Sequence, residues 1–359
     1  MSGRYMMRTG SLLNTAGRVS KSVALNASRF LGVNRCARWV TRSKLLILCY
    51  HGVVADDHPH DAYRYRNTIS QRQFDTQMRL LARLFHPITA HDLLRAMAGT
   101  DRLPPRAVLV TFDDGFRNNL TQAAPVLERH GIPAVFHVTT GYVGQRRRLW
   151  PQELLELVYH WPYKVIPMPG THTDQPVPAE SPARLALAGE IKNRCKQLAA
   201  EALQPYLDRL RSAGAWPTRH GDDELYDFLT WDDVRSLHAR GFTIGSHTVE
   251  HPVLTRLTPD RLADELQRSK ATIERELGAA CTLLAYPNGG REDLSPAVLA
   301  QVKATGYKAA FTLAQHVTTP NANPYALSRI SVPGHVPSYV FHSRISGLHS
   351  LLKRNDAQL

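Results

Sequence analysis

The sequence has few cysteines, no long hydrophobic run and, in its first 44 residues, no acidic side chain. Its four cysteines lie far apart without a CxxC pair, which disfavours a disulfide framework or a thiolate zinc site and fits a reducing compartment. No run approaches the roughly 18 apolar residues of a membrane span, so we expect no integral membrane protein. With 43% hydrophobic residues in 359 positions, the chain can bury a sizeable core, and general disorder is excluded.

The formal net charge of +13 is concentrated at the N-terminus. Residues 1–44 hold seven Arg and two Lys, giving +9, and the remaining 315 residues carry only +4. A basic lead with scattered apolar residues is typical of an interfacial membrane helix, an organellar transit peptide or a solvated leader. It lacks the apolar core of a secretory signal, so we predict a cytoplasmic protein that contacts the inner membrane face peripherally through this lead. Nucleic-acid binding through the lead is the alternative; no aromatic-basic module supports it, so no nucleic-acid partner is expected.

From residue 45 onward, short apolar runs alternate with helical patterns. The predicted strands cover 45–50, 107–112, 134–139, 242–246, 282–286, 309–313 and 326–332. The predicted helices cover 70–85, 118–130, 230–240, 259–277 and 295–305. This alternation predicts an α/β fold with a mostly parallel sheet or barrel, whose chemistry lies at the carboxyl ends of the strands.

Residues 145–229 interrupt this alternation. They contain a Pro-rich piece, a long helical pattern over 182–212 and a polar turn. The stretch is too long for a simple connection, so we interpret it as an insertion near the mouth of the site, either a lid or partner surface or a structural appendage. The predicted organisation is a basic leader 1–44, a catalytic domain 45–335 with this insertion, and a C-terminal helical tail 336–359.

Two adjacent carboxylates, Asp113 and Asp114, directly follow the apolar strand 107–112, and Gly115 comes next. Adjacent carboxylates at a strand end repel each other unless a cation or a shared proton offsets their charge. One alternative is structural: Asp114 caps the helix that begins near Asn118, and Asp113 is solvated. Ligands of parallel sheets bind at the carboxyl ends of the strands, where Asp113 and Asp114 lie, and this position favours a functional role for the pair.

Two imidazoles four residues apart, His247 and His251, follow the strand that ends at Ser246. Such a pair can converge on one metal ion, although about one His-x3-His pair arises by chance among 17 histidines. Its place after a strand strengthens the signal. Together with one carboxylate, two imidazoles form a common open catalytic metal site with room for water and substrate.

Two further histidines lie at or within predicted strands. His51 follows the first strand at the same predicted edge, where it is either a capping residue or a general acid beside the metal site. His137 lies within the strand 134–139, and we interpret it as a hydrogen-bonded interior residue.

Three segments, Thr111-Phe112-Asp113-Asp114-Gly115, Ser246-His247-Thr248-Val249-Glu250-His251 and Ala285-Tyr286-Pro287-Asn288-Gly289, resemble successive motifs of the NodB-homology polysaccharide deacetylases, carbohydrate esterase family 4. The resemblance covers roughly residues 45–335. It implies a deformed (β/α) barrel of the polysaccharide deacetylase type, here with a helical insertion, that removes acetyl groups from N-acetylated sugars with a divalent metal. Carried over, Asp113 is the catalytic base, and Asp114, His247 and His251 are the metal ligands. Tyr286, Pro287 and Asn288 contact the substrate or the oxyanion.

The sequence departs from the family pattern at two places. Many members carry an Arg before the Pro-containing motif that supports the base, and many carry a C-terminal Leu-x-His acid; neither is present here. However, Tyr50-His51-Gly52-Val53 resembles the N-terminal motif of a circularly permuted branch, the bacterial exopolysaccharide deacetylases. In that branch this His takes the acid role, which makes His51 the candidate acid.

The sequence thus predicts a metal-dependent hydrolase that removes N-acetyl groups from an N-acetylhexosamine in a polysaccharide, an oligosaccharide or a lipid-linked glycan. Two imidazoles and one carboxylate suit Zn²⁺, with Co²⁺, Ni²⁺ or Fe²⁺ as alternatives. An O-acetyl esterase or sugar deformylase would use the same machinery. An inactive metal-binding glycan-recognition module is a third alternative, which the presence of both Asp113 and His51 disfavours.

Overall fold

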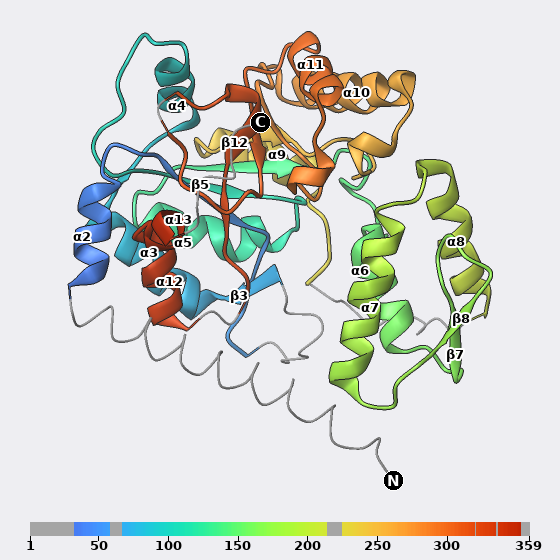
Figure 1. The fold of residues 1–359 in the computed structure, drawn as a ribbon. Coiled ribbons are helices and arrows are strands. Elements are labelled where there is room, and N and C mark those ends of the chain that lie inside the picture. Colours follow the sequence, from blue (N-terminus) through green and yellow to red (C-terminus); the bar gives the residue numbers. More distant parts are fainter. Residues whose placement is uncertain (1–31, 58–66, 214–224, 320, 335–336, 353–359) are drawn as a thin grey trace.

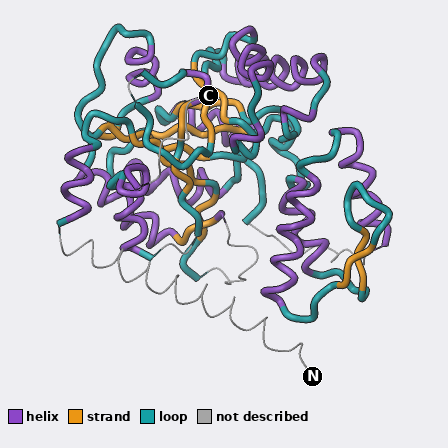
Figure 2. Tube along the Cα trace, in the orientation of Figure 1, coloured by secondary structure: helices purple, strands orange, loops and turns teal. Residues whose placement is uncertain are grey.

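The computed structural model describes residues 32–57, 67–213, 225–319, 321–334 and 337–352. Its centre is a parallel sheet curled into a nearly closed barrel, with helices on the outside (Figures 1 and 2). The strands are β1 (Leu46–Tyr50), β4 (His86–Pro87), β5 (Ala107–Phe112), β6 (Ala134–Val138), β9 (Thr243–Ser246), β10 (Leu283–Ala285), β11 (Ala309–Thr312), β12 (Leu327–Ser328) and β13 (Ile330–Ser331). The predicted (β/α) barrel is confirmed.

The ring closes within one short segment of the chain. Strand order is β12-β11-β10-β9-β6-β5-β1-β13, with β4 added beside β5. The two ends of this order, β12 and β13, are separated by a single residue, Arg329. Residues 327–331 therefore pair with β11 on one side and with β1 on the other. The run 326–332, predicted as one strand, is the seam of the barrel, interrupted at Arg329.

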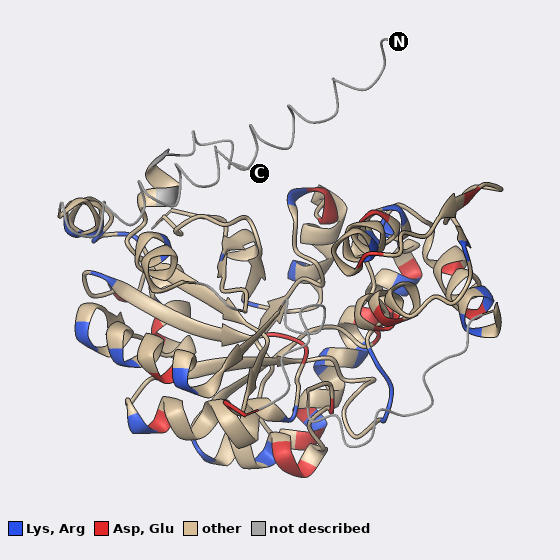
Figure 3. Ribbon diagram, turned by 90° about the horizontal axis from the view of Figure 1, so that it is seen from below, with Lys and Arg blue, Asp and Glu red and all other residues tan. Residues whose placement is uncertain are grey.

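Helices and short elements surround the barrel. The helices are α2 (Val33–Val40), α3 (Gln71–Leu84), α4 (Ala90–Met97), α5 (Ala124–Arg129), α6 (Trp150–Tyr159), α7 (Ser181–Cys195), α8 (Ala200–Ala213), α9 (Trp231–Ala239), α10 (Pro259–Leu277), α11 (Pro296–Ala304), α12 (Ser338–Ile345) and α13 (Leu348–Leu352). Two small sheets pair β2 (Gly52–Val54) with β3 (Thr68–Ser70) and β7 (Val165–Pro167) with β8 (Asp174–Pro176). Figure 3 shows charged residues on the outer helices, around largely uncharged strands.

Alternation along the strands separates two apolar layers. Leu48 and Val110 pack in the layer shared with the outer helices, whereas Ile47 and Leu109 pack in a second cluster with residues of the other barrel strands. Because side chains alternate in direction along a strand, every second residue faces the barrel interior. Burial on both faces explains why these strands read as continuous apolar runs rather than as alternating ones.

Local signals set several helix boundaries. Thr230 and Asp233 form a capping box at the start of α9, which confirms the predicted start. Gly278 ends α10 with φ of 62°, a left-handed conformation that glycine adopts readily. The long helical pattern 182–212 is divided into α7 and α8, a boundary that the periodicity did not indicate.

The helices of the predicted insertion form a lobe beside the barrel (Figure 1). Helices α6, α7 and α8 share a hydrophobic cluster of their own, which includes Trp150, Leu157, Ile191 and Leu207.

The first described helix, α2, packs against the last two, α12 and α13, so the two ends of the described chain lie together. Within the described residues, no helix is both long enough and apolar enough to cross a membrane. Residues 1–31 of the predicted leader lie outside the described residues.

Candidate functional site

The predicted site residues come together at one end of the barrel. His51 follows β1, Asp113 and Asp114 follow β5, and the segment containing His247 and His251 follows β9. These strands run parallel within one sheet, so their carboxyl ends share one rim. The structure therefore places these side chains together at the edge of the barrel that the sequence predicts.

Three side chains form a compact set of candidate metal ligands. One ligand atom each from Asp114, His247 and His251 lies within 4.8 Å of the others. The Nε2 atoms of His247 and His251 lie 3.5 and 3.6 Å from Asp114 Oδ1. Bonds of about 2.0–2.2 Å to a tetrahedral zinc place neighbouring ligand atoms about 3.3–3.6 Å apart. The donor set and its separations thus fit a divalent metal with one open position. Asp113 is buried rather than solvated, which counts against the alternative in which Asp114 only caps a helix.

Hydrogen bonding, burial and the neighbouring charges set the protonation of the two histidines. His247 Nδ1 lies 2.8 Å from the carbonyl oxygen of Ala285, which can only accept a hydrogen bond, so Nδ1 carries the proton and Nε2 is left to face Asp114. Burial works against a charge on His247, but Asp113 and Asp114 outweigh it and raise the pKa of His247 above its usual value. Burial and the neighbouring His247 lower the pKa of His251 to about 3, so this imidazole is neutral.

The loops that carry these ligands have unusual backbone conformations. Asp114, Thr248, His251 and Asn288 all have positive φ, between 56° and 76°. Side chains other than glycine rarely adopt this region, and such strain gathers at functional sites. Four of the six such residues in the described part of the chain lie in the three motifs.

Asp113 is held by a buried arginine. Arg329, at the barrel seam, donates from both terminal nitrogens to the two carboxylate oxygens of Asp113, at 2.7 and 2.6 Å. It also donates to the Thr111 hydroxyl and the Thr312 carbonyl. Burial alone would raise the pKa of Asp113, but the charges of Arg329 and His247 hold it well below its usual value. Asp113 is therefore an anion throughout the neutral pH range.

Two more side chains touch Asp113 from the barrel interior. Cys49 Sγ lies 3.3 Å from Asp113 Oδ2, and His137 Nδ1 lies 3.2 Å from Asp113 Oδ1. Burial raises the pKa of the Cys49 thiol well above its usual value, so the thiol is protonated and donates to the carboxylate. The interpretation of His137 as a buried, hydrogen-bonded residue is confirmed; its contact with Asp113 was not expected.

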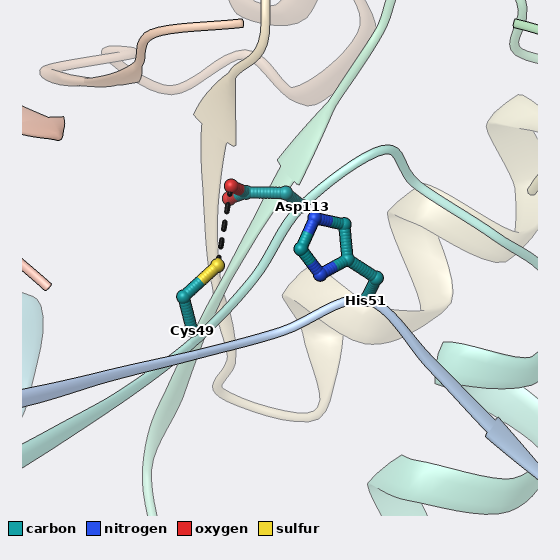
Figure 4. Close-up of side chains that lie close together, drawn as sticks. All are labelled: Cys49, His51 and Asp113. Carbon is teal, nitrogen blue, oxygen red and sulfur yellow. Dashed lines mark hydrogen bonds between the residues drawn. The ribbon is translucent and has the colours of Figure 1, made fainter. Parts of the chain in front are cut away.

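The His51 ring lies beside Asp113 and Cys49 (Figure 4). Ligand atoms of Cys49, His51 and Asp113 lie within 4.8 Å of one another. Both oxygens of Asp113 already accept charged hydrogen bonds from Arg329, and this buried guanidinium repels a second cation. The group therefore suits proton transfer better than a second metal. His51 is half-buried, and its carbonyl oxygen accepts a hydrogen bond from Asn119.

The third motif contributes less than the sequence suggested. The ring of Tyr286 is buried in the core, and its hydroxyl donates to the Tyr325 carbonyl, so this side chain faces away from the rim. Pro287 is buried as well. Asn288 is half-buried, and its Nδ2 group has no hydrogen-bond partner within the described chain. Of the three, Asn288 offers a free donor for a substrate.

Three supporting residues were missed by the sequence analysis. Arg329, at the barrel seam, supports the proposed base Asp113, a role that the family resemblance gave to an Arg before the Pro-containing motif. Cys49 lies two residues before His51, and no local sequence signal indicates its contact with Asp113. Glu265 of α10 is buried and accepts the N–H groups of Val249 and Glu250, at 2.8 and 3.0 Å, which anchors the loop between the two histidines.

The sequence model of the family described as "Polysaccharide deacetylase" matches residues 100–165 and 199–310. The chain belongs to the polysaccharide deacetylase family. By family, the protein is therefore a deacetylase, a hydrolase that acts on glycans. A similar curated protein is YxkH of Bacillus subtilis (strain 168), named after the same family, which is 20% identical over 294 residues, 81% of this chain and 73% of that protein.

Solved deacetylases share the fold. The Streptococcus pyogenes deacetylase PplD aligns with a TM-score of 0.53 and 16% identity, over 87% of this chain and 99% of PplD. IcaB from Ammonifex degensii aligns with a TM-score of 0.53 and 20% identity, over 85% of this chain and 97% of IcaB. Residues 166–198, between the two matched parts of the family model, belong to the lobe that contains α7.

Proposed function

We propose that this polysaccharide deacetylase is a metal-dependent N-deacetylase that acts on an N-acetylhexosamine within a glycan. The observation that carries the proposal is the convergence of Asp114, His247 and His251 beside a carboxylate, Asp113, that accepts two hydrogen bonds from buried Arg329. Binding alone needs no such carboxylate, so the arrangement favours an enzyme over a glycan-recognition module.

Asp114, His247 and His251 would hold the metal, with zinc favoured by two imidazoles and one carboxylate. A divalent cation there supplies a Lewis acid that polarises the acetyl carbonyl and lowers the pKa of the attacking water. Because its pKa is low, Asp113 is a weak base. It can take a proton from the attacking water only if the pKa of that water is lowered as well.

The side chains around this centre would transfer protons and stabilise the oxyanion. Asp113 accepts the proton of the water whose oxygen attacks the acetyl carbon. His51 donates a proton to the sugar nitrogen as the C–N bond breaks, so that a neutral amine leaves with acetate as the second product. Asn288 Nδ2, which has no partner among the described residues, can donate to the developing oxyanion.

Acetate release separates this function from its nearest alternative. Wild-type protein supplied with zinc should release acetate from N-acetylated oligosaccharides and leave their O-acetylated counterparts largely intact. Without a proton donor the nitrogen would have to leave as an amide anion, which departs from carbon far less easily than an alkoxide, so an O-acetyl esterase would tolerate His51→Gln, whereas the N-deacetylase should not. Acetate or formate release only from O-acetylated or N-formylated sugars would replace the proposal with the esterase or the deformylase.

We also propose peripheral membrane contact at the cytoplasmic face. Helix α2, the described end of the basic lead, exposes Trp39 and Val40, and the Arg42 guanidinium lies 4.3 Å above the Trp39 ring. Exposed aromatic and basic groups of this kind suit an anionic lipid surface. Co-sedimentation with vesicles containing anionic lipid should fall in Trp39→Ser, and equal co-sedimentation would remove this part of the proposal.

A further inference from the structure

The loop that carries both proposed histidine ligands also packs against the helical lobe. This histidine loop, residues 247–253, runs from the end of β9 to the short helix Leu254–Arg256. Val253, its last residue, belongs to the hydrophobic cluster of α6, α7 and α8. Just beyond the loop, Arg256 Nε donates to the carbonyl oxygen of Lys196, the residue after α7, at 3.1 Å. The lobe therefore contacts the chain shortly after His251.

Trp150, the first residue of α6, contacts the second histidine itself. Its indole Nε1 donates to the carbonyl oxygen of His251 at 3.3 Å, and its ring is buried in the hydrophobic cluster of the lobe. The backbone N–H group of His251 donates to the Thr248 hydroxyl at 3.1 Å. Both backbone polar groups of His251 are thus held, one from within the histidine loop and one from the lobe.

The two histidines differ in how their rings are held. His247 Nδ1 donates to the Ala285 carbonyl, as metal-bound imidazoles usually do to a neighbouring acceptor. His251 Nδ1 is buried and has no hydrogen-bond partner within the described residues. The direction of the His251 ring therefore depends on its backbone. That backbone has a φ of 56°, a conformation that persists in a residue other than glycine only where the surrounding structure holds it.

We propose that Trp150 is a positioning residue for His251 and that it couples the helical lobe to the metal site. The proposal rests on the proposed function, because it takes Asp114, His247 and His251 as the metal ligands. The indole donor fixes the His251 carbonyl, so that Nε2 of the same residue stays directed at Asp114. Without this donor the histidine loop gains freedom, and ordering it costs part of the free energy of metal binding. The insertion is then a support of the metal site rather than a separate appendage.

Zinc competition with a chelator compares two equivalent substitutions in the full-length protein. Trp150→Phe keeps an aromatic ring in the lobe and removes the donor to His251. Trp161→Phe is the matched control: Trp161 is buried in the same cluster, but its Nε1 donates to the Val165 carbonyl inside the lobe, at 2.7 Å. Loss of an outer hydrogen bond typically lowers metal affinity 10–100-fold. We expect this loss in Trp150→Phe and the wild-type affinity in Trp161→Phe.

Urea unfolding of the metal-free proteins separates positioning from a general loss of packing. Both substitutions remove the same atoms from one hydrophobic cluster, so the two variants should lose similar stability without metal. A lower zinc affinity confined to Trp150→Phe then reflects the contact with His251. Equal zinc affinity in the wild type and Trp150→Phe would overturn the proposal, and so would equal losses of affinity in the two variants.

Hydrogen exchange of the wild type tests the coupling without a substitution, in case Trp150→Phe does not fold. Coupling is reciprocal, so a contact that tightens zinc binding 10–100-fold makes opening of the lobe rarer by the same factor once zinc is bound. Exchange of the α6 amides through lobe opening should therefore slow about 10–100-fold at saturating zinc. Exchange of α6 at one rate with and without bound zinc would overturn the proposal.

Failure of this proposal is distinguishable from failure of the proposed function. A wild-type protein that binds no zinc would contradict the metal site and, with it, the role of Trp150. Zinc bound as tightly by Trp150→Phe as by the wild type would contradict the role of Trp150 alone and leave Asp114, His247 and His251 as the ligands.

Discussion

The guanidinium of Arg329 and the carboxylate of Asp113 form a two-pronged, fully buried ion pair. Arg329 is the single residue between β12 and β13, where the barrel closes, and Asp113 follows β5. One side chain thus links the seam of the barrel to the proposed catalytic base. The pair also holds the base anionic, so closure of the fold and preparation of the site depend on the same contact.

Breaking this pair should destabilise the protein strongly. In Arg329→Gln or Asp113→Asn the remaining partner is a buried charge without its counter-ion, which costs about 3–5 kcal/mol. The double variant leaves neither charge, so it should recover much of this loss while remaining inactive. Urea unfolding of the wild type, both single variants and the double variant measures the coupling. Additive losses in the double variant would show that the two side chains do not act as a pair.

His51→Gln should lower kcat by about 10²–10⁴-fold, the usual contribution of a positioned proton donor. Its metal content should equal that of the wild type, because His51 is not among the three proposed ligands. Steady-state kinetics and elemental analysis on the same preparation give both numbers. Loss of metal together with activity would assign His51 to the metal site instead.

Glu265→Ala should weaken metal binding without removing a ligand. The buried carboxylate anchors the backbone between His247 and His251 through two hydrogen bonds, and loss of such outer contacts typically costs 10–100-fold in metal affinity. Asp264→Ala is the matched control, because this neighbouring side chain is exposed and pairs only with Arg268 in the described structure. Competition with a chelator measures both affinities, and equal values would show that the loop needs no anchor.

The stability of the metal-free protein should fall in acid partly through Asp113. The pKa of Asp113 is depressed in the folded state, so its contribution is complete above its unfolded value of about 3.9 and is lost as pH falls toward the folded value. Unfolding free energies of the wild type should therefore decrease below about pH 4, by up to about 1.4 kcal/mol per pH unit for this group. The Asp113→Asn, Arg329→Gln double variant should show a shallower slope. Parallel slopes would place the acid sensitivity elsewhere.

Local patterns predicted most of the fold and the candidate ligands. Apolar runs bounded by Gly131, Gly241 and Gly306 identified the strands, because parallel strands buried on both faces carry continuous apolar sequence. The motif residues were also found, since each directly follows a strand, and parallel strands end at one rim.

The supporting residues could not be predicted in the same way. The pairing of Arg329 with Asp113 depends on barrel closure, which brings together residues 216 positions apart. Glu265 lies on the buried face of α10 with Leu262 and Leu266, but helical periodicity does not show that the backbone N–H groups of Val249 and Glu250 lie against it. Cys49 has the character of any small apolar strand residue until the register of β1 against β5 places it beside Asp113.

The central claim is that Asp114, His247 and His251 hold a divalent metal. Elemental analysis of wild type, His251→Ala and the exposed-histidine control His238→Ala, each supplied with zinc and then dialysed, tests it without knowledge of the sugar. We predict about one metal ion per chain in wild type and in His238→Ala, and none in His251→Ala. A wild-type protein that retains no metal, or a His251→Ala variant that retains as much as wild type, would contradict the account.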